Sequence, residues 1–135
     1  MILVVDANVI FSALLVRQSA TEDLFFKKQL LPYSPEFVWT EFSKYEGTLL
    51  EKTNRSSEGF AEVLTALKKR VQLVSEEEIR PFLMHATLVS PDIKDAPYFA
   101  VCLKLNAGLW SNDKRLKKQD KIRVWSTSEL MSLLQ

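Results

Sequence analysis

The chain has 135 residues, of which 47% are hydrophobic and 26% charged, so it can build the core of one soluble domain over residues 1–135. Its net charge of +1 excludes a global attraction to nucleic acid or membrane. With one cysteine, one histidine and three glycines, the chain can form neither a disulfide nor a cysteine-based zinc site, and it has no glycine-rich phosphate loop. No segment is long and apolar enough to span a bilayer, and a strand expected from residue 2 leaves no room for a signal peptide. We therefore expect a cytoplasmic protein without a membrane partner.

The N-terminal part predicts two strands and two helices. Ile2–Val5 is apolar and mostly β-branched, as in a strand that is buried on both faces. This strand ends in the carboxylate of Asp6, and residues 9–15 and about 21–28 then have the apolar content of helices. Leu30–Tyr33 reads as a second strand, and its proline predicts a position near a sheet edge.

The middle of the chain predicts two helices and a third strand. Ser34–Glu36 has the pattern of a helix start, with a capping serine and a proline at the first helical position. The helix would run past Glu41 to about Leu49, followed by a helix over 58–70 and a strand over 71–74.

The C-terminal part completes an alternation of strands and helices. A helix begins at residue 76, and residues 96–105 form a helix that is apolar almost all round and therefore buried. Strands are expected at 109–111 and 122–125, before a last helix that starts near Thr127. This alternation predicts an α/β fold, in which a parallel sheet carries helices on both faces.

Four carboxylates stand at positions that are unusual for structural residues. Asp6 ends the first strand, Asp95 opens the most apolar helix and Asp113 follows the fourth strand. Glu41 interrupts the apolar face of its helix, where burial is unfavourable without a positive partner. Structural alternatives remain open, since the aspartates could cap helices and Glu41 could reach solvent.

The carboxylates gain significance if they meet. Ligands of an open α/β sheet bind at the carboxyl ends of its strands, so Asp6 and Asp113 would share an edge if their strands are neighbours. Carboxylates gathered in one cleft repel each other and imply a cation. Without histidine or cysteine ligands, Mg²⁺ or Mn²⁺ is favoured over zinc.

Three segments resemble the acidic motifs of PIN-domain proteins. Val4–Leu15 looks like the opening motif, and Pro91–Pro97 and Leu109–Leu116 look like the two later ones, with Glu41 between them. The order and spacing cover residue 2 to about residue 125. This resemblance implies a PIN-like three-layer α/β/α sandwich with a five-stranded, mainly parallel sheet in the order 3-2-1-4-5.

The resemblance also implies an activity, a cofactor and partners. It suggests an endoribonuclease that depends on Mg²⁺ or Mn²⁺, often the VapC-type toxin of a toxin–antitoxin pair. We therefore expect RNA as substrate, and a cognate antitoxin protein and a second copy of the chain as partners.

Site residues follow from their positions in the motifs. Asp6, Asp95 and Asp113 match the acidic positions and are the expected metal ligands, and Glu41 completes the expected catalytic quartet. The other predicted site residues, which support the acids or bind substrate, are Asn8, Asp92, Ser111, Asn112, Lys114 and Arg115.

The chemistry expected of this set is hydrolysis of a phosphodiester. A divalent ion would lower the pKa of a water molecule and neutralise phosphate charge, and Glu41 would hold a water or a second ion or act as general base. The basic run from Lys114 to Arg123 could bind the phosphate backbone or form an ordinary solvated loop.

Other function classes fit the sequence less well. A phosphatase of the haloacid-dehalogenase type needs a second aspartate where this chain has Asn8. A receiver domain needs an acidic pair before its phosphoacceptor, where this chain is apolar. A PIN-like module that binds RNA or protein with weak or no catalysis remains the alternative.

Overall fold

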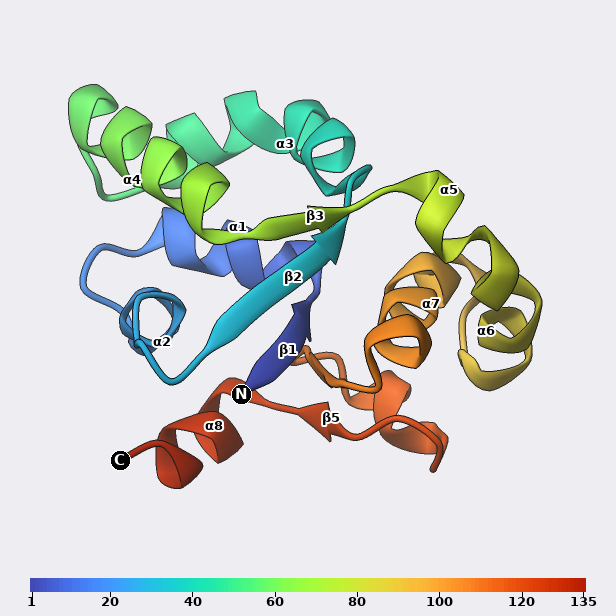
Figure 1. Ribbon diagram of the computed structural model, residues 1–135. Coiled ribbons are helices and arrows are strands. Elements are labelled where there is room, and N and C mark those ends of the chain that lie inside the picture. The colour runs from blue at the N-terminus through green and yellow to red at the C-terminus, as the bar shows by residue number, and fades with distance from the viewer.

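A five-stranded parallel sheet forms the centre of the computed structural model, which describes residues 1–135 (Figure 1). The strand order is β3-β2-β1-β4-β5, and every neighbouring pair is parallel, which confirms the predicted order. The strands are β1 (Ile2–Val5), β2 (Leu31–Pro35), β3 (Gln72–Val74), β4 (Gly108–Trp110) and β5 (Val124–Trp125).

Helices pack around the sheet in two groups. One group is built on α1, which contacts α2, α3 and α4, and the other on α7, which contacts α5, α6 and three strands (Figure 1). No helix is long and apolar enough to cross a membrane. The helices are α1 (Ala7–Leu15), α2 (Ala20–Phe25), α3 (Val38–Lys52), α4 (Ser57–Arg70), α5 (Glu76–Ile79), α6 (Leu83–Val89), α7 (Ala96–Leu105) and α8 (Thr127–Leu133), with short 3-10 turns η1 (Arg80–Phe82), η2 (Ile93–Asp95) and η3 (Lys114–Lys118).

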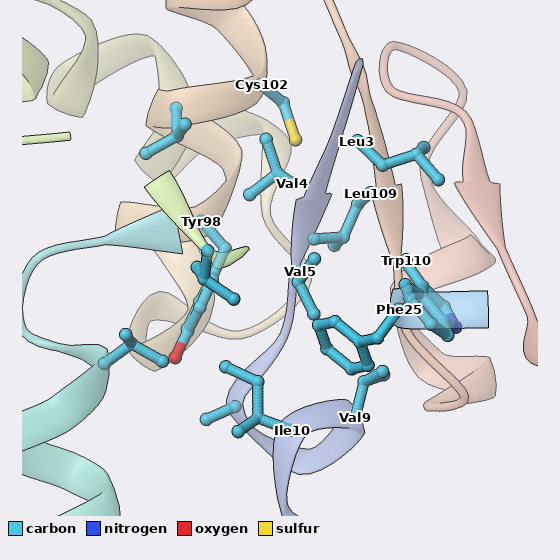
Figure 2. Packing of buried hydrophobic residues seen from close by; sticks show 14 of the residues in the cluster. Leu3, Val4, Val5, Val9, Ile10, Phe25, Tyr98, Cys102, Leu109 and Trp110 are labelled. Carbon is cyan, nitrogen blue, oxygen red and sulfur yellow. The ribbon is translucent and has the colours of Figure 1, made fainter. Parts of the chain in front are cut away.

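The core lies on both faces of β1. Leu3, Val4 and Val5 are completely buried because helices cover the sheet on each side. Figure 2 shows Val4 near Cys102 of α7, and Phe25 of α2 against Trp110 of β4, with ring centroids 4.8 Å apart. This packing holds β1 and β4 in place within the sheet. The predicted site lies at the carboxyl ends of these two strands.

The prediction that Pro32 places β2 near an edge is confirmed, because β2 is next to the edge strand β3 and pairs with it only from Tyr33 onwards. Proline is tolerated there because the β2–β3 ladder begins only at Tyr33, which pairs with Gln72. Pro32 pairs in register with Leu3, and successive residues of a strand direct their amides to opposite sides. The missing amide of Pro32 therefore falls where β3 has not yet begun.

The helix start predicted at Ser34–Glu36 is wrong. Ser34 and Pro35 are the last residues of β2, and α3 begins at Val38 without a side-chain cap. The Ser34 hydroxyl is buried and donates to the Val5 carbonyl oxygen at 2.6 Å. Ser34 and Pro35 therefore belong to a paired strand, although their local pattern favours a helix start.

Gly108→Ala is expected to destabilise the protein by about 1–3 kcal/mol through overpacking. A Cβ atom at Gly108 would lie 2.9 Å from the Arg123 carbonyl oxygen, which accepts the Leu109 amide at the β4–β5 junction. Gly47→Ala is the matched control, because nothing lies within 4 Å of its added Cβ and α3 should gain up to about 1 kcal/mol. Thermal melting compares the two variants, and equal melting temperatures would contradict the expected clash.

Candidate functional site

A cleft of about 790 Å³ opens at the carboxyl edge of the sheet and contains the predicted acids. Asp6 follows β1 and Asp113 follows β4, and these strands are neighbours with Val5 in register with Trp110. The other acids in its wall are Glu41 of α3, Asp95 of η2 and Asp92 in the preceding loop. The structure therefore brings together acids that are far apart in the sequence.

Asp6 caps α1 and also faces the cleft. Its side chain is 7% exposed, its Oδ1 accepts from the Asn8 amide at 3.2 Å, and its Oδ2 accepts from the Ser111 hydroxyl at 2.8 Å. Burial raises the pKa of the Asp6 carboxyl, these hydrogen bonds oppose the rise, and the charge of Asp113 adds to it. The capping role and a functional role are thus compatible, because the carboxylate also remains in the cleft wall.

Asp95 lies at the start of α7 without capping it, since its side chain accepts no hydrogen bond from the helix. Burial raises the pKa of Asp95 to about 6, and the charges of Asp6, Asp92 and Asp113 contribute to the rise. The capping interpretation of Asp95 is therefore wrong. The raised pKa reflects first the burial of the carboxyl and then the negative charge of the neighbouring acids.

Asp95→Asn is expected to stabilise the metal-free protein at pH 8 but not at pH 4. The pKa of Asp95 is about 6 in the fold and 3.8 ordinarily, so the folded state binds this proton more tightly than the unfolded chain. The resulting stability is complete below pH 3.8 and is lost as the pH rises through about 6. At pH 8 the ionised carboxylate therefore opposes folding, and the amide does not.

The gain at pH 8 is expected to be modest because Asp95 is partly exposed and water screens its charge. We expect about 1 kcal/mol, or roughly 2–4 °C in Tm. Thermal melts in EDTA at the two pH values measure it. A variant that differs from wild type by the same amount at both pH values would contradict the assignment to this carboxyl.

Asp113 precedes η3, caps this turn and is paired with Arg115. Its Oδ1 accepts from the Arg115 amide at 3.0 Å and from Arg115 Nε at 3.1 Å, and its Oδ2 accepts from Arg115 Nη2 at 2.8 Å. The guanidinium lowers the pKa of Asp113. Asp113 is therefore the one acid of the cleft that carries a bound positive partner in this structure.

Glu41 is partly buried in the cleft wall and contacts a residue that the sequence prediction missed. The Tyr98 hydroxyl donates to Glu41 Oε2 at 3.4 Å. The Tyr98 ring packs on the Phe37 ring, with ring centroids 5.5 Å apart. Burial raises the pKa of Tyr98, and the charges of Glu41 and Asp6 raise it further, so the phenol remains protonated. The spacing of Asp95 and Tyr98 on one helix face was a signal that could have identified Tyr98.

The predicted supporting residues divide between the cleft and its surroundings. Ser111 is buried under Asp6, and Asn8 and Arg115 line the cleft. The Asn112 side chain instead binds the start of α8, where its Oδ1 accepts the Thr127 amide at 2.8 Å. Asn112 also lines a shallow recess beside the cleft, with Asp6 and Asn8.

The basic run after Asp113 contributes little to the cleft. Only Arg115 of this run lines it, and Lys114 borders a separate surface recess. Lys117 and Arg123 form ion pairs with Glu129 of α8. The other cations of the cleft are Lys52 of α3 and Lys94 of η2, which the sequence prediction missed because both are distant from Asp113 along the chain.

The donor set of the cleft fits a hard divalent cation. Its ligands are carboxylate oxygens without histidine or cysteine, which is the chemistry that Mg²⁺ and Mn²⁺ prefer. The acids do not stand in an arrangement that would hold an ion as they are. The hydrogen bonds described above turn Asp6 towards Ser111 and Asp113 towards Arg115, so binding would require rearrangement of side chains.

Comparison with known proteins adds a family to this geometry. A search of curated proteins found no match. The PIN-domain family matches the chain over residues 4–135, a range that contains the whole sheet except the first residues of β1 and all the acids of the cleft. With this match and the strand order of its sheet, the chain belongs to the PIN-domain family.

Proposed function

We propose that this protein is an endoribonuclease that hydrolyses RNA with the help of Mg²⁺ or Mn²⁺. PIN domains are in general nucleases and usually use divalent metals. The observation that carries the proposal is the meeting of Asp6, Glu41, Asp95 and Asp113 in one cleft at the carboxyl edge of the sheet. No single local motif requires this convergence, because capping alone would not direct acids from separate segments to one place.

The proposed roles follow from position. Asp6, Asp95 and Asp113 would hold the cation, which when bound would neutralise phosphate charge and acidify a water molecule. Glu41 accepts the proton of the water whose oxygen attacks phosphorus, and Tyr98 orients Glu41 through its hydroxyl. Ser111 orients Asp6 in the same way. The bond from phosphorus to the 3′-oxygen breaks, the leaving 3′-oxygen takes a proton from solvent, and the product retains a 5′-phosphate.

Two features of the cleft favour single-stranded RNA as substrate. Lys52, Lys94 and Arg115 place positive charge beside the acids, where a phosphate backbone would lie. Phe11 and Tyr45 form an aromatic wall with ring centroids 5.6 Å apart, and Tyr45 is 52% exposed. Exposed aromatic rings stack on unpaired bases, whereas bases in a duplex are not accessible to them.

The test is incubation of purified protein with end-labelled single-stranded RNA, with Mg²⁺ or Mn²⁺ and with EDTA. We expect cleavage with either metal, none in EDTA, and recovery when metal is added in excess. Binding of RNA without cleavage in either metal would overturn the proposal. That outcome would favour the alternative, a PIN-like module that binds RNA or protein without catalysis.

We propose further that the enzyme acts in the cytoplasm as a toxin with a cognate antitoxin and as a homodimer. The VapC-like resemblance of its motifs supports the toxin role, and exposed apolar side chains such as Met84 and Leu88, each 82% exposed, offer surface for protein partners. Growth arrest on expression, relieved by Asp6→Asn or by a neighbouring reading frame, tests the toxin role. Light scattering of the purified protein tests the dimer.

A further inference from the structure

The ion pair between Arg115 and Asp113 has an unusual place for a surface salt bridge. Both partners line the cleft that contains Asp6 and Asp95. The guanidinium contacts both oxygens of the carboxylate, at 3.1 Å and 2.8 Å, in a two-point arrangement. The Arg115 side chain is nevertheless 67% exposed, so only the fork holds it at Asp113.

This arrangement makes Arg115 a competitor for the ligand atoms of Asp113. Oδ1 accepts from the Arg115 amide and Nε, and Oδ2 accepts from Nη2. Both oxygens of the Asp113 carboxylate are therefore already engaged by Arg115. A hard cation needs the same oxygen lone pairs. Because exposed ion pairs are weak and long side chains move easily, the guanidinium can yield to a divalent ion.

We propose that Arg115 and the divalent cation are alternative partners of Asp113, so that cation binding releases the guanidinium to hold a phosphate of the substrate. The inference rests on the proposed function. A released Arg115 remains anchored at η3 in the wall of the cleft, and its planar fork matches two phosphate oxygens as well as it matches a carboxylate. The pair therefore protects the cleft from charge repulsion before the cation arrives, and it couples cation binding to RNA binding.

Cation binding without RNA gives the first test. We expect Arg115→Ala to lower the dissociation constant for Mn²⁺, measured by calorimetry, by about three- to fivefold relative to wild type, since the competing pair is lost. Lys94→Ala is the matched control, because Lys94 also lines the cleft but forms no ion pair with Asp113. It reports the general effect of removing one positive charge, and we expect a smaller change. Arg115→Lys, which keeps the charge without the fork, should fall between the two.

The fate of the guanidinium gives the second test. The NMR signal of Arg115 Nε–H, identified by its absence in Arg115→Lys, should shift when Mg²⁺ is added, because its hydrogen bond to Asp113 Oδ1 breaks. In the Glu41→Gln background, which suppresses cleavage, Mg²⁺ should increase RNA affinity more than it does in Glu41→Gln/Arg115→Ala. Loss of Arg115 is thus expected to change the two affinities in opposite directions: the cation binds more tightly and RNA binds more weakly.

The outcomes separate this inference from the proposed function. If wild type binds Mn²⁺ and Arg115→Ala binds it no more tightly than Lys94→Ala, competition is overturned and the proposed function stands. If the Nε–H signal does not move at saturating Mg²⁺, release of the guanidinium is overturned in the same way. If wild type binds neither Mn²⁺ nor Mg²⁺, both the inference and the metal-dependent function fail.

Discussion

Replacing both Asp6 and Asp95 by asparagine is expected to reduce RNA cleavage by at least about 100-fold without unfolding the protein. These acids approach the cleft from β1 and from the start of α7, and the proposed cation would lose charged ligands from both sides. Cleavage of labelled RNA at saturating Mn²⁺ measures the loss. Asp23→Asn/Asp120→Asn is the matched control, because both of these aspartates are exposed and lie outside the cleft wall.

The stability of the single variant Asp6→Asn distinguishes a functional acid from a simple helix cap. Asparagine caps helices as well as aspartate, and its amide can donate to the Ser111 hydroxyl that now donates to Asp6. The neutral side chain also removes the desolvation of a buried charge and its repulsion with Asp113. Melting in EDTA is therefore expected at the wild-type temperature or higher. A large fall in Tm, or full activity of the double variant, would contradict the proposed role.

Arg55→Ala is expected to destabilise the protein by about 3–5 kcal/mol, the largest stability effect that we predict. The Arg55 side chain is 3% exposed and pairs with Glu22 at 2.8 Å. Its guanidinium also donates to the carbonyl oxygens of Ala13 and Leu14 at the end of α1. The variant would leave the Ala13 carbonyl and the Glu22 carboxylate without their arginine partner, while the Leu14 carbonyl keeps the Thr53 hydroxyl at 2.9 Å.

Chemical denaturation measures the effect of Arg55→Ala, and a decrease of about 10 °C or more in Tm should accompany it. Arg80→Ala is the control, because Arg80 is exposed and forms no ion pair. Glu22→Gln added to Arg55→Ala should recover part of the loss, since the unpaired carboxylate is then neutral. A loss below about 1 kcal/mol for Arg55→Ala would show that water replaces the guanidinium. The pair matters for the cleft because α1 carries Asp6 at its other end.

Two kinds of sequence signal predicted the fold correctly. Apolar runs such as Ile2–Val5 and residues 96–105 predicted a strand and a helix at the observed places. Both elements are largely buried, so their sequences are apolar almost throughout and easily recognised. The strand order came from the family resemblance, since periodicity contains no information on which strands are neighbours. The prediction from a short local pattern failed at Ser34–Pro35, where pairing between strands outweighs local preference.

The site was predicted as a set of acids but not as a charged environment. The acids reach the cleft because they end or follow elements whose positions the sheet determines. Which cations line the cleft depends instead on tertiary packing. Lys117 follows Asp113 closely in the sequence but pairs with Glu129 of α8, whereas Lys52 and Lys94 reach the cleft from other segments. Tyr98 was missed because an aromatic residue in an apolar helix reads as core, and it is indeed 3% exposed.

The hydrogen bond between Ser111 and Asp6 joins residues that are 105 positions apart. During synthesis β1 leaves the ribosome long before its neighbour β4 and the acid that follows β4. Such long-range pairing forms late in folding, because the chain must lose the entropy of closing a large loop before any contact between the strands stabilises it. A nascent chain that stops before β4 therefore contains Asp6 but not Asp113, and the proposed nuclease lacks part of its site until β4 and Asp113 have been translated.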